Sequence, residues 1–259
     1  MGKIISLVNQ KGGVGKTTTS INLAASLGLL GKKVLLVDLD PQGNATTGVG
    51  VEKGDLTSSI YEALNGIVSP YEAVRKTKFK NLDLIPATIT LAGIEVEFID
   101  RAKDDPTFVK SMQLKRVLSE LRDNYDFILI DCPPSLTILT INALTASDSV
   151  LIPVQCEYFA LEGIMQLLNT IKQARKNLNP TLDIEGVLLT MLSRTNLGLE
   201  VVENVRSFFR EKVYDTIIPR LIKITEAPSH GKPIVDYDPD SRGTEAYINL
   251  AKEVIERNE

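Results

Sequence analysis

The chain has 259 residues, 43% of them hydrophobic, which suits one large α/β domain spanning residues 1–259. Lysine and arginine together number 29 against 33 acidic residues, and the formal net charge of -4 excludes a globally basic protein that coats nucleic acid. The two cysteines, Cys132 and Cys156, are too few for a disulfide framework and indicate a reducing cytosol. No apolar stretch approaches the ~18 residues of a membrane span, and no signal peptide is present, so we expect a soluble, cytoplasmic protein.

Strands and helices are expected to alternate along the chain. Short apolar runs predict strands at residues 4–8, 33–38, 82–85, 126–131, 149–154, 184–192 and 216–219. Helices are expected at residues 20–30, 57–64, 70–76, 112–124, 138–146, 160–177, 199–212 and 241–257. Three segments are interpreted as irregular: residues 44–56, the polar surface connection at 100–106 and a proline-rich loop after 219. The alternation predicts a doubly wound, mostly parallel sheet flanked by helices on both faces.

Residues 10–18, Gln-Lys-Gly-Gly-Val-Gly-Lys-Thr-Thr, connect the first predicted strand to the first predicted helix. Glycine-rich turns in this position let successive backbone N–H groups point at an anion, and the following helix adds the positive end of its dipole. In such a P-loop the lysine supplies charge to the β- and γ-phosphates and the next hydroxyl suits Mg²⁺. We therefore expect nucleotide phosphates to be bound by Gly12, Gly13, Val14, Gly15, Lys16, Thr17 and Thr18.

Acidic residues follow two of the predicted strands, where ligands bind in doubly wound sheets. Asp131 ends an apolar run and has the form of a Walker B acid that holds Mg²⁺ through water. The prolines at 133 and 134 extend the next loop, which suits a sensor of the γ-phosphate. Asp38 and Asp40 can divide the work, one supporting the metal and the other polarising the attacking water. The alternatives are that Asp131 caps a helix near residue 136 and that Asp40 only opens a turn.

The glycine-rich stretch departs from the usual P-loop pattern, because Gln10 stands where glycine is expected and Lys11 follows it. The form K-G-G-x-G-K-T-T resembles the deviant P-loop of the ParA/MinD family of ATPases. Further stretches are similar to the ParA/Soj-type members: DCPPSL at 131–136, TINAL at 140–144, PVQCEY at 153–158 and EAPSHGKP at 226–233. The resemblance covers essentially the whole chain and implies an ATPase that uses ATP and Mg²⁺.

The resemblance also implies roles for particular residues. Lys11 reaches across a nucleotide-sandwich homodimer to the phosphates of the other chain, although it can also be read as a solvated loop lysine. Asp40 activates the attacking water and acts with Lys11 and Lys16 in catalysis. The metal-binding set is Thr17, Asp40 and Asp131, and the adenine ring lies between the segments that contain Met191 and Pro219-Arg220. Glu157 contacts nucleotide or bridges the dimer.

Charge is uneven in the last third of the chain. Residues 194–223 hold six basic and four acidic side chains, whereas residues 224–259 hold four basic and eight acidic ones. Arg206 and Arg210 are expected to share one helix face, although Arg206 can also pair simply with Glu203. By resemblance, the residues that contact DNA backbone without sequence preference are Arg194, Arg206, Arg220 and Lys223.

The function implied by the resemblance is DNA segregation. An ATP-bound homodimer binds non-specific double-stranded DNA in the nucleoid, and a ParB-like protein stimulates slow hydrolysis. A MinD-like membrane role is the alternative, but the polar side of residues 246–259 is mostly acidic, the wrong sign for anionic lipid. A small-molecule kinase and an iron protein with a cluster held by Cys132 and Cys156 are further alternatives. His230 is interpreted as a loop contact, because hydrolysis needs no imidazole.

Overall fold

The structure is a computed structural model that describes residues 1–157, 160–192 and 196–259. The strands are β1 (Lys3–Leu7), β2 (Val34–Asp38), β3 (Arg75–Lys76), β4 (Leu82–Ile85), β5 (Phe127–Asp131), β6 (Ser149–Gln155), β7 (Asp183–Leu192) and β8 (Val213–Pro219). The helices up to the middle of the chain are α1 (Lys16–Leu29), α2 (Asn44–Gly48), α3 (Ile60–Asn65), α4 (Pro70–Ala73), α5 (Ile94–Asp104), α6 (Gln113–Leu121) and α7 (Ile138–Ala146). The later helices are α8 (Ala160–Asn177), α9 (Asn196–Phe209), α10 (Ile222–Glu226), α11 (Ile234–Tyr237) and α12 (Arg242–Glu256). Short 3₁₀ helices are η1 (Lys53–Asp55), η2 (Ile89–Gly93), η3 (Arg122–Asn124), η4 (Arg210–Lys212) and η5 (Ala227–His230).

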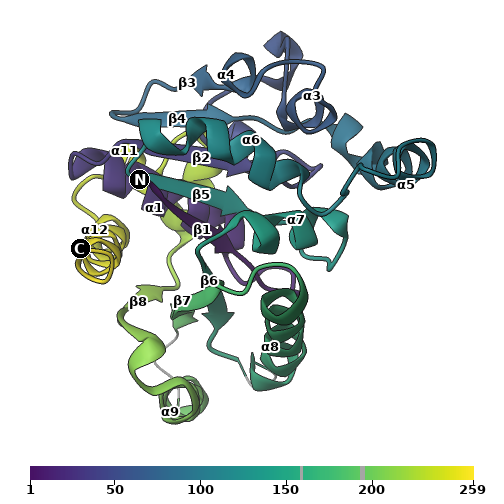
Figure 1. Cartoon of the computed structure of the whole chain (residues 1–259). Coiled ribbons are helices and arrows are strands. Elements are labelled where there is room, and N and C mark those ends of the chain that lie inside the picture. Colours follow the sequence, from purple (N-terminus) through teal and green to yellow (C-terminus); the bar gives the residue numbers. More distant parts are fainter. Residues whose placement is uncertain (158–159, 193–195) are drawn as a thin grey trace.

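Within the described residues the strands form one sheet in the order β3-β4-β2-β5-β1-β6-β7-β8. Every neighbouring pair is parallel except β3 and β4. Leu7, Asp131 and Asp38 stand opposite one another on β1, β5 and β2, so the loops after these strands leave the same edge of the sheet (Figure 1). The doubly wound, mostly parallel sheet predicted from the alternation of elements is therefore confirmed.

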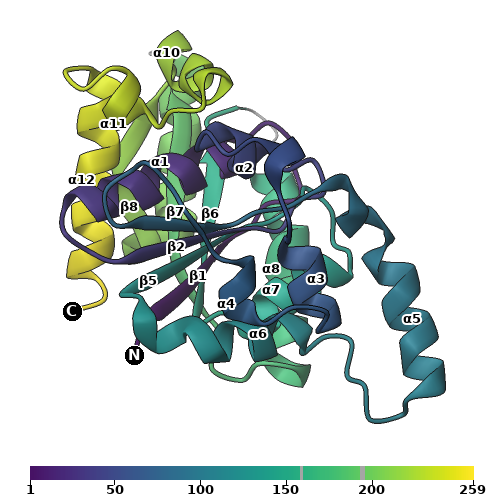
Figure 2. The same cartoon turned by 90° about the horizontal axis from the view of Figure 1, so that it is seen from above.

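Alternate side chains of the central strands pack against two different helix layers. Leu36 and Leu129 belong to a hydrophobic cluster with α1 and α12, whereas Leu35 and Ile128 belong to a second cluster with α6, α7 and α8. Figure 2 shows these two sets of helices on opposite faces of the sheet. Parallel strands buried on both faces need apolar residues at almost every position, which explains the uninterrupted apolar runs in the sequence.

The segment 44–56 was predicted as a loop, and this prediction is wrong. It contains α2 and η1. Gly43 precedes α2 in the left-handed conformation (φ 60°), and Thr46 within the helix bonds to the Asp38 carboxylate. A glycine before a helix and a threonine within it give little local signal, so the helix depends on a contact that only the folded chain supplies.

Other boundaries also differ from the prediction. Residues 75–76 form β3 rather than the end of a helix, because α4 ends at Ala73 and the next residue is extended. Helix α5 continues to Asp104, so residues 100–104 are helical and not a surface connection. Helix α9 ends at Phe209, which places Arg210 in η4 and off the helix that carries Arg206. The loop predicted after β8 contains α10, η5 and α11.

The last helix, α12, packs on the sheet, which its apolar side favours, and it also packs on α1. Tyr247, Leu250 and Val254 are buried on its inner side. The Arg257 guanidinium lies 4.1 Å from the centre of the Tyr214 ring and anchors the end of the helix. No helix among the described residues is long and apolar enough to cross a membrane.

Gly28 of α1 offers a test of this packing, because a Cβ there would lie 2.3 Å from the Lys80 carbonyl oxygen. Alanine is normally better than glycine in a helix by about 1 kcal/mol. We expect the reverse here, with Gly28→Ala lowering the free energy of unfolding by about 1–3 kcal/mol. Urea denaturation measures this, and Gly93→Ala is the control, since its nearest contact is Glu97 at 3.6 Å. A Gly28→Ala variant as stable as the wild type would contradict the predicted clash.

Candidate functional site

The loop between β1 and α1 has the conformation that its glycines permit. Gly13 and Gly15 adopt positive φ angles of 75° and 87°, where other residues are strained. The Thr190 hydroxyl on β7 donates to the Val14 carbonyl at 2.9 Å and ties the loop to the sheet. Gly15 immediately precedes α1, so the loop and the first turn of the helix present their N–H groups together.

Lys16 begins α1 and is buried beside this loop. Its ammonium donates to the Lys11 carbonyl at 3.2 Å. Burial lowers the pKa of Lys16, while the nearby negative charges of Asp131 and Asp40 raise it. The Lys16 ammonium is therefore a buried positive charge that a bound phosphate can stabilise.

Two fully buried carboxylates face each other at the ends of β2 and β5. Asp38 accepts hydrogen bonds from the Thr46 backbone N–H and hydroxyl, both at 2.7 Å. Asp131 accepts one from the Ser20 hydroxyl at 2.9 Å. Burial raises the pKa of Asp38 to about 6, and burial with the Asp38 charge raises the pKa of Asp131 to about 7. The ionised carboxylates repel each other, and a bound cation would reduce this repulsion.

The Asp131 carboxylate fits the metal-binding role expected of it. Its Oδ2 atom is buried and has no hydrogen-bond partner among the described residues, while the nearby Thr17 hydroxyl lowers the pKa of this carboxyl. An orphaned buried carboxylate oxygen next to a threonine hydroxyl suits Mg²⁺ or a water bound to it. Helix α7 begins at Ile138, so Asp131 does not cap it.

Asp40 lies half-buried in the loop between β2 and α2. One of its oxygens accepts from the Gln42 N–H at 2.9 Å, and its carbonyl accepts from the Gly43 N–H at 2.8 Å. Asp40 therefore does open a turn, as the alternative reading held. Its side chain nevertheless also lines the cleft described next, so the two readings are compatible.

A cleft of about 700 Å³ contains most of the predicted phosphate and metal residues. It is lined by Gly12, Gly13, Gly15, Lys16, Thr17 and Thr18 from the P-loop, by Asp40 to Gln42, and by Pro133 to Ser135. A second pocket of about 270 Å³ adjoins it and shares Gly15, Thr18, Met191 and Thr225 with it. The two pockets are therefore adjacent near the start of α1.

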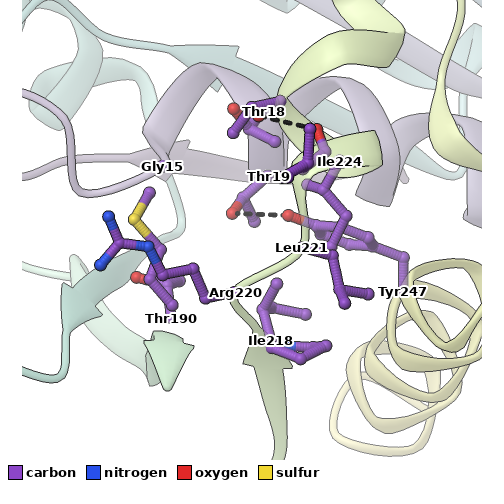
Figure 3. A pocket seen from close by; sticks show the side chains of 13 residues that line it. Gly15, Thr18, Thr19, Thr190, Ile218, Arg220, Leu221, Ile224 and Tyr247 are labelled. Atoms are coloured by element: carbon purple, nitrogen blue, oxygen red, sulfur yellow. Dashed lines mark hydrogen bonds between the residues drawn. The ribbon is translucent and has the colours of Figure 1, made fainter. Parts of the chain in front are cut away.

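The smaller pocket is mainly apolar (Figure 3). Met191, Pro219 and Arg220, expected around the adenine ring, all line it, with Ile218, Leu221 and Tyr247 completing its wall. The backbone of Met191 has a positive φ of 54°, a strained conformation that is common at binding sites. On the α1 side the Thr19 and Tyr247 hydroxyls lie 3.5 Å apart. A mainly apolar pocket next to an anion-binding loop suits the base of a nucleotide.

Lys11 of the P-loop pairs with Glu157, just after β6. Lys11 is exposed, and its ammonium is 3.3 Å from the Glu157 carboxylate. Lys11 does not belong to the described residues that line the cleft of its own chain. The structure thus separates the two loop lysines, with Lys16 inside the cleft and Lys11 outside it.

Of the four predicted DNA-binding residues, the three that the structure describes do not form one cluster. Arg194 lies outside the described residues. Arg220 and Lys223 line a groove with Arg242, and Lys223 is paired with Asp238 at 2.8 Å. Arg206 on α9 lies 3.9 Å from Asp215 rather than against Glu203. Asp215 lies near the start of β8, and Arg220 directly follows the strand five residues later, about 16 Å away, so Arg206 lies near the other end of that strand.

Both cysteines are buried free thiols, and His230 stacks on Tyr237 with ring centres 5.1 Å apart. Three further residues were not singled out from the sequence. Ser20 carries a weak signal, since it lies one helical turn after Lys16 and faces the same way. Thr46 and Tyr247 carry none, because their roles depend on chain segments that are distant in sequence.

The fold and the cavity together define a P-loop nucleotide-binding protein. The chain matches the AAA domain family over residues 2–184. It is 60% identical over 255 residues to the sporulation initiation inhibitor protein Soj of Bacillus subtilis (strain 168), covering 98% of each chain. It is 50% identical over 259 residues to the chromosome-partitioning ATPase Soj of Treponema pallidum (strain Nichols), covering 100% of this chain and 99% of that one. The chain therefore belongs to the ParA/Soj family of chromosome-partitioning ATPases.

A solved structure is also similar. The crystal structure of cobyrinic acid a,c-diamide synthase from Mycobacterium smegmatis, with bound ATP analogue and magnesium, has a TM-score of 0.88 and 36% identity. The similarity covers 100% of this chain and 96% of that one. The described fold is thus one that holds a nucleotide and magnesium in a related protein.

The variant Asp131→Asn tests whether burying the two carboxylates destabilises the protein. In the wild type, the pKa of the Asp131 carboxyl is about 7 in the folded chain, above the ordinary 3.8. The folded state therefore binds the carboxyl proton more tightly than the unfolded state, and the free energy of unfolding falls as pH rises through this range. Without nucleotide, we expect the variant to be more stable than the wild type by about 1–2 kcal/mol at pH 8. Near pH 4.5 the difference should be small. Thermal unfolding at both pH values measures this, and a variant less stable at pH 8 would be evidence against it.

Proposed function

We propose that the chain is an ATP-driven dimerisation switch that binds DNA without sequence preference and acts in DNA partitioning. The observation that carries the proposal is the separation of the two loop lysines. Lys16 supplies positive charge inside the cleft, whereas the Lys11 side chain is exposed and Lys11 is not among the described residues that line the cleft. The proposal therefore requires a second copy of the chain. Lys11 reaches the nucleotide phosphates that this second copy binds.

In this proposal the cavity binds ATP with Mg²⁺. The P-loop N–H groups and Lys16 hold the phosphates, and the base lies in the apolar pocket next to Met191, Pro219 and Arg220. Thr17, Asp131 and Asp40 would hold Mg²⁺, which neutralises charge on the phosphate oxygens when it is bound. The orphaned Asp131 oxygen supports this assignment.

Asp40 is the residue proposed to orient and polarise the attacking water. Its turn fixes the loop through the bonds to Gln42 and Gly43, while its half-buried carboxylate borders the cleft. Asp38 and Asp131 are both fully buried and engaged by Thr46 or Ser20, which leaves Asp40 as the more accessible carboxylate. A single modest base suits slow hydrolysis, since phosphoryl transfer depends mainly on positioning and charge.

DNA binding is proposed to use Arg220, Lys223 and Arg194, with Arg206 as an outlying contact. Arg220 lines both the base pocket and the groove that contains Lys223 and Arg242, which we call the basic groove. Nucleotide and DNA would therefore act on the same segment after β8. Lys223 must exchange Asp238 for a DNA phosphate, which makes it a weaker contact than a free cation. A dimer doubles these contacts, and a ParB-like protein resets the switch by stimulating hydrolysis in the nucleoid, within the cytoplasm.

Asp40→Ala separates ATP binding from hydrolysis. The variant lacks the group that polarises water, so we expect turnover to fall by about 10²-fold or more while ATP and Mg²⁺ still produce a dimer. Analytical ultracentrifugation with ATP should show a persistent dimer. Lys16→Ala is the control and should bind no nucleotide, because the cleft loses its buried cation. Finding only monomeric Asp40→Ala protein with ATP would contradict the proposal.

DNA binding is the experiment that tests the function directly. Retention on double-stranded DNA is measured without nucleotide, with ADP and with ATP, at two salt concentrations. We expect retention only with ATP, and a steep loss at the higher salt, because several phosphate contacts release counterions. Equal retention on DNA with and without nucleotide would exclude an ATP-driven switch. Binding to anionic vesicles instead would favour a MinD-like role, and transfer of phosphate to an organic acceptor would favour a kinase.

Charge reversal then locates the contacts. Arg220→Glu, Lys223→Glu and Arg194→Glu should each weaken DNA retention. ATP-dependent dimerisation should persist in the Lys223 and Arg194 variants, since only Arg220 is expected next to the base, and Arg206→Glu should have a smaller effect on DNA retention. The matched control is Arg116→Glu, since Arg116 is exposed on α6, away from the basic groove. Undiminished retention in all of the first three variants would rule out the proposed surface.

A further inference from the structure

The contact between Lys11 and Glu157 has a defined geometry. The Lys11 ammonium lies 3.3 Å from one Glu157 oxygen, and the Gln155 side-chain amide donates to the other oxygen at 2.5 Å. Both carboxylate oxygens are thus engaged, so the carboxylate has a fixed orientation toward the lysine. The two residues come from segments 146 positions apart, the P-loop and the end of β6.

A second, buried contact holds these segments at this distance. The Asn9 side chain accepts from the Lys11 N–H at 3.0 Å and donates to the Pro153 carbonyl at 2.7 Å. Asn9 is 6% exposed, so its bridge between the loop and β6 belongs to the protein core. The backbones of Lys11 and Glu157 therefore remain adjacent whether or not their side chains touch, and only the side chains are free to exchange partners.

We propose that Glu157 is a positioning residue that holds Lys11 against its own chain until the triphosphate of a second chain replaces it. This inference rests on the proposed function, in which Lys11 binds the phosphates of the facing subunit. One ammonium cannot satisfy both anions fully, so Glu157 competes with the phosphates for Lys11. A triphosphate carries more charge than a single carboxylate and displaces it, whereas a nucleotide without the γ-phosphate displaces it less well.

The expected effect is moderate, because the ion pair is open to solvent. The side chains of Lys11 and Glu157 are 40% and 50% exposed. Exposed pairs of this kind contribute little individually, and a dimer must release two of them. Removing both carboxylates should therefore tighten ATP-dependent dimerisation by about twofold to thirtyfold.

The test is a double-mutant cycle on dimerisation with Mg²⁺ and a non-hydrolysable ATP analogue. Sedimentation over a range of protein concentrations gives the dimer dissociation constant for the wild type, Glu157→Gln, Lys11→Ala and the double variant. We expect Glu157→Gln to dimerise more tightly than the wild type, and to have no further effect in the Lys11→Ala background. The gain should shrink as salt is raised, since the lost competition is electrostatic.

The Lys212–Asp183 pair provides the matched control. It is 2.9 Å long, its side chains are 40% and 57% exposed, and it lies at the start of β7, away from the cleft. Asp183→Asn should leave dimerisation unchanged. Unchanged or weaker dimerisation of Glu157→Gln, with normal wild-type behaviour, overturns the inference alone. A wild type that stays monomeric with the analogue, or Lys11→Ala that dimerises as the wild type does, overturns the proposed function and this inference with it.

Discussion

The adjacent carboxylates of Asp38 and Asp131 are the constraint around which this end of the molecule is arranged. They lie opposite each other on β2 and β5, fully buried, and their burial raises both pKa values. A protein does not gain stability from two acids in such a position, because each loses its water and repels the other. Lys16 offsets part of this charge, and the neighbouring cleft, which Lys16 and Asp40 line, is accordingly suited to a bound cation and phosphate.

This constraint extends to elements that are distant in sequence from the two acids. Asp38 holds Thr46, and Thr46 fixes α2. The end of α2 contacts the turn after η5, where a Cβ on Gly231 would lie 2.7 Å from the Gly50 Cα atom, so only glycine permits the approach. The same turn leads back to α10, which carries Lys223 and borders the base pocket. The motif at 226–233 thus connects the acid pair to the basic groove through packed backbone.

Sequence patterns predicted the strands and the P-loop well because those features are local. A buried parallel strand needs a continuous apolar run, and a phosphate loop needs glycines next to a lysine. The sequence also predicted that Asp131 lies at the end of a strand, because it follows an apolar run. Helix α2 was not, since Thr46 is held there by Asp38 rather than by helix propensity. The wall formed by Tyr247 was equally hidden, because α12 lies against α1 only in the folded chain.

The two loop lysines show why a short motif carries more than phosphate affinity. Lys16 is buried, and Asp131 and Asp40 within the same chain offset only part of the cost of burying its charge. Lys11 is five residues earlier, exposed, and balanced by a carboxylate that it can release. A cation with a weak, solvent-exposed partner is available for exchange, whereas a buried one is not. The loop therefore combines a permanent contact with a conditional one, and the conditional contact is the part that can make assembly depend on the nucleotide.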